Sequence, residues 1–364
     1  MKLEEADKNM KVVEFDPNSI VYYDPIKSKK FKIKGLAFFE KEHKYFRLPT
    51  DCKDKVSEAV YWLANHPSGG QIRFRTNAKK IVVKIENTGD YQMCHMPATS
   101  QQGVDLYYKL KGQKKYTFFE CAKFNIPTVE FESPLFDSDE KMDKDIIINL
   151  PLYEGLGKIL IGIEADAKIY KAKERKDKEK IVYYGTSITQ GGCVSRPGLS
   201  FTNILSRKLN TEFINLGFSG SGLGEPELAE IITQIDNVKM IVLDYEGNGG
   251  CTGHLEKYME EFIDILRKKW PIIPIVIITK TWFTNYVFLQ NEVAARKRLY
   301  DFQLNVVNQR NAKGDNNIYF IDGSKLFGNE DIDECLIDGI HPGDLGFYRI
   351  AKNLEPKLKK ILNK

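Results

Sequence analysis

The sequence predicts an α/β protein in two parts, with a mostly β region followed by a domain built on a parallel sheet. Up to about residue 170, short runs rich in Val, Ile, Phe and Tyr recur between Gly, Pro, Asn and Asp residues. A stretch of mixed charge follows at residues 165–180. Beyond it, apolar runs alternate with segments of helical spacing, which is typical of βαβ units. The length of 364 residues also fits two domains.

The first part, residues 1–172, is expected to be an all-β sandwich or jelly roll, because its strand-like runs are short and evenly spaced. Apolar and charged side chains alternate in these runs, as at Ile72 and Phe74 around Arg73. The expected strands are residues 34–39, 71–74, 80–85, 103–110, 116–122, 128–132, 144–150 and 158–163.

The second part, residues 173–364, is expected to form three layers, with a parallel sheet between two layers of helices. The expected strands are residues 181–184, 212–216, 240–243, 272–279 and 318–321, and the expected helices are residues 198–209, 225–235, 255–269 and 291–311. Right-handed crossovers place such helices on both faces of the sheet. Functional groups in this architecture gather at the carboxyl ends of the strands.

Composition excludes several classes of protein. The net charge is +4, with lysine and acidic residues interspersed, so no nucleic-acid partner is expected. No apolar run approaches ~18 residues, so no membrane span is expected. The N-terminus lacks the apolar segment of a signal peptide, which favours a cytoplasmic protein or one exported with its signal removed. Six scattered cysteines and five histidines show no metal-binding spacing, so free thiols and no metal site are expected.

A serine stands at the end of the first strand of the second part. The fragment Gly185-Thr186-Ser187 follows the apolar run 181–184 and precedes a glycine pair at residues 191–192. A strand-to-helix turn of this kind presents a serine side chain rigidly. The alternative is an ordinary turn or a helix-capping serine, since Ser and Gly are frequent in both.

A carboxylate and an imidazole lie three residues apart near the C-terminus, at Asp338 and His341. A serine hydroxyl is a weak nucleophile that needs a base to take its proton and an acid to orient that base. The chain supplies these groups in the order Ser187, Asp338, His341. The alternative for the last two is a surface turn with a capping aspartate.

Two further segments follow strands of the same domain. Residues 215–222 form a loop of small residues, in which backbone N–H groups can approach a ligand oxygen closely. Residues 244–250 contain Asn248, whose amide can donate to a developing oxyanion. The alternatives are a flexible loop and an Asn-Gly turn. Each signal is weak alone, but their order along one domain favours a single site for ester hydrolysis.

These four segments together resemble the sequence blocks of the SGNH (GDSL-like) hydrolases. The resemblance implies a flavodoxin-like catalytic domain over residues 173–364, with Ser187 as nucleophile, His341 as base and Asp338 as its orienting acid. It also implies an oxyanion hole made by the backbone N–H groups of Ser187 and Gly220 and the side chain of Asn248. Thr186, Glu246 and Gly249 depart from the family pattern, which indicates a divergent branch.

A second resemblance lies upstream. Residues 103–107, Gly-Val-Asp-Leu-Tyr, resemble the Gly-x-Asp-Leu-Tyr signature of a β-rich domain that precedes some SGNH hydrolases. Asp105 is therefore a candidate for substrate binding at the cleft, with an Asx-type turn before a strand as the alternative.

The resemblance implies a serine esterase that removes small acyl groups, acetyl in particular, from carbohydrates without a cofactor. Aromatic rings suit sugar faces, so Trp282, with Phe283 and Tyr286, is a candidate binding wall; a hydrophobic packing segment is the alternative. A lipase or thioesterase for longer acyl chains and a non-catalytic carbohydrate-binding protein remain open. The sequence does not fix the oligomeric state.

Overall fold

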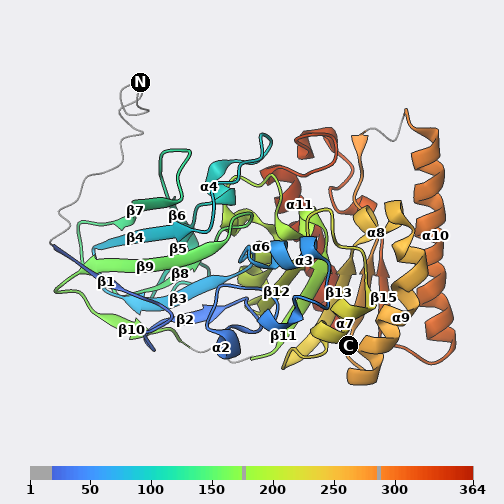
Figure 1. The fold of residues 1–364 in the computed structure, drawn as a ribbon, viewed down its shortest axis with the longest axis horizontal. Coiled ribbons are helices and arrows are strands. Elements are labelled where there is room, and N and C mark those ends of the chain that lie inside the picture. The colour runs from blue at the N-terminus through green and yellow to red at the C-terminus, as the bar shows by residue number, and fades with distance from the viewer. Residues whose placement is uncertain (1–18, 174–177, 285–287, 364) are drawn as a thin grey trace.

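The computed structural model describes residues 19–173, 178–284 and 288–363. It contains two antiparallel sheets from the first half of the chain and one parallel sheet from the second half. Figure 1 shows the antiparallel sheets at one end of the molecule and the parallel sheet with its helices at the other. This arrangement confirms the predicted fold class.

The antiparallel sheets form the N-terminal sandwich. The first has the order β1 (Ile20–Tyr23), β9 (Leu156–Glu164), β4 (Lys80–Asn87) and β7 (Glu130–Asp137). The second has the order β10 (Ile169–Lys171), β3 (Gln71–Thr76), β8 (Lys144–Asn149), β5 (Asp105–Leu110) and β6 (Thr117–Cys121), with β2 (Lys32–Lys34) also paired to β3. Alternate residues of β3 and β4 point into one shared core, which includes Ile72, Phe74, Ile81 and Val83.

The predicted strand at residues 34–39 is wrong beyond Lys34. Gly35 has a φ of 81°, and a Cβ there would lie 2.0 Å from the carbonyl oxygen of Gly69. The chain therefore turns at Gly35 and continues into a short helix, α2 (Phe39–Glu42). Strand β10 was also not expected, because it lies inside the charged stretch that marks the boundary between the two parts.

The parallel sheet has the strand order β12 (Glu212–Gly217), β11 (Lys180–Gly185), β13 (Val238–Asp244), β14 (Ile275–Ile278) and β15 (Ile318–Ile321). This order, 2-1-3-4-5 along the chain, is that of flavodoxin-like sheets. The direction of the crossovers changes between β11 and β13, and ligands in such folds bind outside the carboxyl ends of the strands at that point.

Helices cover both faces of this sheet. One face is covered by α6 (Phe201–Leu209) and α11 (Asp344–Leu362), and the other by α7 (Pro226–Ile232), α9 (His254–Lys269) and α10 (Gln290–Ala312). Alternate residues of β11 serve the two cores, with Ile181 and Tyr183 on one side and Val182 and Tyr184 on the other. Within the described residues, no helix combines the length and the apolarity needed to cross a bilayer.

The boundary between residues 172 and 173 stays a prediction, but packing crosses it. Helix α3 (Glu58–Ala64) and the chain around it bury Phe46, Leu48 and Leu63 in the same core as Ile214 and Leu216 of β12. A segment of the N-terminal half therefore supports the strand that leads into the glycine-rich loop of the second half.

Candidate active site

Ser187 lies where the switch point of the sheet predicts a functional group. It is the first residue of the short helix α5 (Ser187–Gln190), which begins directly after β11 with Thr186 as its cap. A Cβ at Gly185 would lie 2.1 Å from Oγ1 of Thr189, so only glycine permits this close turn. The side chain of Ser187 lines a pocket of about 460 Å³.

Hydrogen bonds join Ser187, His341 and Asp338, which are named here the Ser–His–Asp group. Oγ of Ser187 lies 2.9 Å from Nε2 of His341, and Nδ1 of His341 lies 2.7 Å from Oδ2 of Asp338. The other carboxylate oxygen of Asp338 accepts the backbone N–H groups of Ile340 (3.0 Å) and His341 (2.7 Å). The structure thus brings together the three groups that an activated serine requires.

The carboxyl group of Asp338 is held in its charged form. Partial burial alone would raise its pKa, but hydrogen bonds from the backbone of His341, from the imidazole and from the backbone of Ile340 outweigh that effect. Together they lower the pKa to about 2. Asp338 is therefore a carboxylate throughout the neutral range, able to orient the imidazole and to stabilise an imidazolium.

Gly220 and Asn248 line the same pocket as Ser187 and His341. Gly220 has a φ of 67° and lies exposed in the turn after β12. Asn248 lies in the first turn of α8 (Glu246–Thr252), directly after β13, and its Oδ1 accepts the N–H of Gly222 (3.4 Å). That bond directs the donor end of the amide away from Gly222. The two residues and the first amide of α5 are thus placed at the carboxyl ends of neighbouring strands.

Two buried residues that the sequence did not suggest position the serine turn. The hydroxyl of Tyr153, in the N-terminal half, donates to the carbonyl of Ser187 (3.0 Å). Gln190 donates to the carbonyl of Leu152 (3.0 Å) and accepts the N–H of Ser219 (3.0 Å), next to Gly220. Each contact joins segments that are distant in sequence, so no local spacing indicated it.

The structure places Asp105, a candidate for substrate binding, at the contact between the two halves of the chain. Asp105 is fully buried and does not line the pocket. Its carboxylate accepts hydrogen bonds from Arg196 Nη1 (2.8 Å), the backbone of Gly198 (2.8 Å) and Asn149 Nδ2 (2.7 Å). A buried carboxylate needs such partners, and here the opposite charge comes from the second half of the chain. Asp105 therefore fastens the sandwich to the loop before α6.

Trp282 is also absent from the pocket lining. It is half-buried, packs against the core that includes α6 and α11, and has the guanidinium of Arg296 5.2 Å from its ring centre. Trp282 therefore belongs to a hydrophobic packing segment, which was the alternative to a binding wall. Its neighbour Phe283 does line the pocket. Tyr286, the third residue of the expected aromatic wall, lies outside the described residues.

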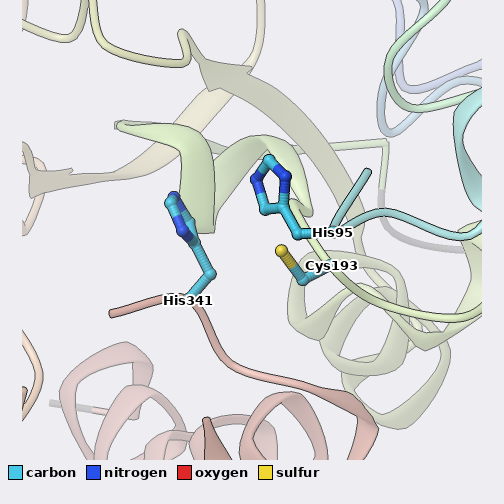
Figure 2. Close-up of side chains that lie close together, drawn as sticks. All are labelled: His95, Cys193 and His341. Atoms are coloured by element: carbon cyan, nitrogen blue, oxygen red, sulfur yellow. The ribbon is translucent and has the colours of Figure 1, made fainter. Parts of the chain in front are cut away.

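The sequence also gave no sign that His95 and Cys193 flank His341. The rings of His95 and His341 are 5.7 Å apart, centre to centre, and Cys193 lies beside both (Figure 2). Burial, with a smaller contribution from the charge of Asp338, raises the pKa of the Cys193 thiol to about 12. The expected lack of clustering among cysteines and histidines therefore holds along the sequence but not in space.

Comparison with known proteins matches both halves of the chain. A family model described as the GDSL-like lipase/acylhydrolase family matches residues 178–359, half of the chain. A second model, described as the N-terminus of SGNH hydrolase-type esterases, matches residues 20–169. The chain belongs to the GDSL-like lipase/acylhydrolase family. It is an esterase of the class that hydrolyses carboxylic esters. No curated protein sequence matches the chain.

Several solved structures share the fold of this chain over most of its length. A protein assigned as a GDSL-like lipase from Bacteroides ovatus is 33% identical, with a TM-score of 0.86, covering 94% of this chain and 98% of its own. The salicylyl-acyltransferase SsfX3 of a tetracycline biosynthetic pathway is 18% identical, with a TM-score of 0.76 and coverages of 95% and 98%. A family two carbohydrate esterase from Clostridium thermocellum, in complex with cellohexaose, is 15% identical, with a TM-score of 0.60 and coverages of 81% and 93%. The last two likenesses establish the fold alone.

Proposed function

We propose that this GDSL-like esterase removes small acyl groups, acetyl in particular, from carbohydrates, with Ser187 as its nucleophile. The observation that supports this most directly is the hydrogen-bond series from Ser187 through His341 to Asp338 at the edge of a pocket. Both hydrogen bonds are already at catalytic distance, so the serine needs no rearrangement to be activated.

In the proposed reaction, Ser187 attacks the ester carbonyl while Nε2 of His341 takes the proton from its hydroxyl. The imidazolium that forms is stabilised by the carboxylate of Asp338. His341 then gives the proton to the departing sugar hydroxyl, which leaves an acyl group on Ser187. Water repeats the sequence, and the carboxylic acid is released.

We expect the negatively charged oxygen of the tetrahedral intermediate to bind in the part of the pocket that Gly220 and Asn248 line. The backbone N–H groups of Ser187 and Gly220 and the amide of Asn248 are the proposed donors. Loss of one such donor costs roughly 3 kcal/mol of transition-state stabilisation in serine hydrolases. We expect Asn248→Ala to lower kcat by about 100-fold or more with little change in KM.

A sugar ester fits the mixed lining of the pocket. Apolar side chains lie beside hydroxyl, amide and charged groups, and the lining includes Ile188, Asp244, Asn248, Lys280, Thr281, Phe283, Glu292, Leu326, Ile340 and Ile350. Sugars present both apolar faces and hydroxyl groups, so such a surface suits a sugar ester. The cellohexaose complex of the family two esterase, a protein of the same fold, supports the same substrate class.

The test is an acyl-length series of p-nitrophenyl esters, followed by acetylated xylan and acetylated cello-oligosaccharides, with Ser187→Ala as the control. We expect kcat/KM to fall as the acyl chain lengthens beyond acetate and acetate to be released from the polysaccharides. A preference for long chains would indicate a lipase or thioesterase. Sugar binding without hydrolysis of any ester would indicate a binding protein, and either result would contradict the proposal.

A further inference from the structure

We propose that His95, Cys193 and His341 form a binding site for a zinc-like divalent metal ion that switches the esterase off. One potential ligand atom from each residue lies within 4.8 Å of the other two. The three residues come from separate segments, namely the loop before α4 (Ala98–Gln101), the turn after α5 and the loop before α11, and Figure 2 shows their side chains next to one another. The inhibitory effect rests on the proposed function, but the binding site does not.

Two imidazole nitrogens and one sulfur are donors that Zn²⁺ prefers. A tetrahedral zinc ion, with bonds of about 2.0–2.1 Å to nitrogen and 2.3 Å to sulfur, holds such atoms roughly 3.3–3.7 Å apart. The three donors are spaced up to 4.8 Å apart, so side-chain rotations of modest size would close the site. His95 lies half-buried in a turn outside any helix or strand. A water molecule would take the fourth position.

Cys193 supplies the rigid part of the site. It is buried and follows two glycines, and its φ of 73° is a left-handed conformation that is unfavourable for a non-glycine residue. The turn therefore holds the thiol beside His341 at an energetic cost. Metal binding would displace the thiol proton to solvent and leave a thiolate on the metal, since a coordinating thiol is deprotonated.

Both ring nitrogens of His341 already have partners. Nε2 faces the hydroxyl of Ser187, and Nδ1 faces the carboxylate of Asp338. A metal ion that binds either nitrogen removes one of these two hydrogen bonds, so the imidazole cannot serve the metal and the serine together. Metal binding and ester hydrolysis therefore exclude each other, and metal removal by a chelator should restore the activity.

Binding is tested directly with Co²⁺ on the Ser187→Ala variant, which needs no catalytic activity for its readout. Zn²⁺ itself has a filled d shell and gives no spectrum, whereas cobalt bound to a thiolate gives a charge-transfer band. We expect this band in Ser187→Ala, its loss in Ser187→Ala/Cys193→Ser, and binding weaker by about tenfold or more in Ser187→Ala/His95→Asn. Absence of the band, or its persistence without the Cys193 thiol, would overturn the site.

Inhibition is tested by titrating Zn²⁺ against p-nitrophenyl acetate hydrolysis, with each variant compared with its own metal-free rate. We expect inhibition that EDTA reverses in the wild type, and a weakening of about tenfold or more in His95→Asn and in Cys193→Ser. The matched controls are Cys94→Ser, an exposed thiol next to His95, and His254→Asn, a histidine bonded to Thr252. Equal inhibition in all variants would contradict the switch. An inactive wild type that still shows the cobalt band would refute the proposed function and leave the metal site standing.

Discussion

The two ends of the Ser–His–Asp group are held in different ways. Ser187 is buried, and the turn that carries it is fixed by residues far away in sequence, among them Tyr153 of the N-terminal half. Asp338 and His341 are more exposed, with 35% and 19% of their side-chain surfaces accessible. Their loop is closed locally by a bridge between Leu336 and Pro342 and by the bonds that Asp338 accepts.

Ser187 and His341 are therefore held in place by different parts of the molecule. The position of Ser187 depends on how the sandwich and the parallel sheet pack together. The position of His341 depends mainly on its own loop, which the backbone N–H of Thr284 also joins at the carbonyl of Gly339 (3.1 Å). Substitutions at the contact between the halves should therefore act on stability and on the serine turn. Substitutions in the loop should act on the chemical step and leave the fold intact.

The largest effect within this comparison is expected from Asp338→Asn. The amide cannot stabilise the imidazolium and favours the wrong tautomer of His341, so kcat should fall by roughly 10⁴-fold, as in other serine hydrolases. Steady-state kinetics with p-nitrophenyl acetate measures the change. Unchanged kcat would show that another group orients the imidazole.

The same substitution has a predicted effect on stability that depends on pH. The folded-state pKa of Asp338 is lowered to about 2, so its stabilising contribution is present above the ordinary pKa of 3.8 and is lost as the pH falls through about 2. The wild type should therefore be more stable than Asp338→Asn at pH 7, with the difference vanishing near pH 2. Denaturant unfolding at both pH values checks this.

At the contact between the halves, Asp105→Asn should lower the free energy of unfolding by about 3–5 kcal/mol. The substitution leaves the guanidinium of Arg196 buried without its counter-charge. Urea unfolding measures the loss. The matched control is Asp166→Asn, which removes an exposed, solvent-screened ion pair with Lys141 and should change the free energy of unfolding little. Equal losses in the two variants would contradict the role assigned to Asp105.

A smaller effect is expected from Tyr153→Phe, which keeps the buried ring and removes its bond to the carbonyl of Ser187. Stability should fall by about 1 kcal/mol, and kcat should fall several-fold because the serine turn gains freedom. The control is Tyr45→Phe, since the buried hydroxyl of Tyr45 has no hydrogen-bond partner among the described residues. If both variants keep the wild-type kcat, the sandwich does not position the nucleophile.

A separate effect, on the pH dependence of stability alone, concerns Asp244, at the end of β13. Burial raises its pKa to about 7, with the Tyr183 hydroxyl opposing this shift and Glu246 adding to it. The folded state therefore holds this proton more tightly than the unfolded state, so stability should decline as the pH rises from about 4 to about 7. The melting temperature of Asp244→Asn should therefore fall less than that of the wild type over this pH range, which thermal unfolding at several pH values measures. An unchanged pH dependence would refute the assignment.

Much of the fold was predictable because periodicity is a local signal. The strand at residues 181–184 and the helix at residues 255–269 are found almost at their predicted limits. The turn at Gly35 was missed because the carbonyl of Gly69 requires it, and no local pattern shows that contact. Helix α11 was not expected either, although together with α6 it covers one face of the parallel sheet.

The residues of the candidate site also differ in how well the sequence indicated them. Ser187, Asp338 and His341 could be singled out because the short segments that carry them occur together, in order, along one domain. The contacts of Tyr153, His95 and Cys193 depend on how the two halves pack, which the sequence does not show. Asp105 was misplaced for the same reason, since a conspicuous motif marked an important residue without indicating whether it faces the cleft or the contact between the halves.

The central claim is that Ser187 is the nucleophile of this esterase. It is tested most directly by hydrolysis of p-nitrophenyl acetate with the wild type and Ser187→Ala side by side, with circular dichroism to show that both are folded. We predict that the wild type hydrolyses the ester and that the variant loses this activity by a factor on the order of 10⁴ or more. Equal activity in the two folded proteins would contradict the account.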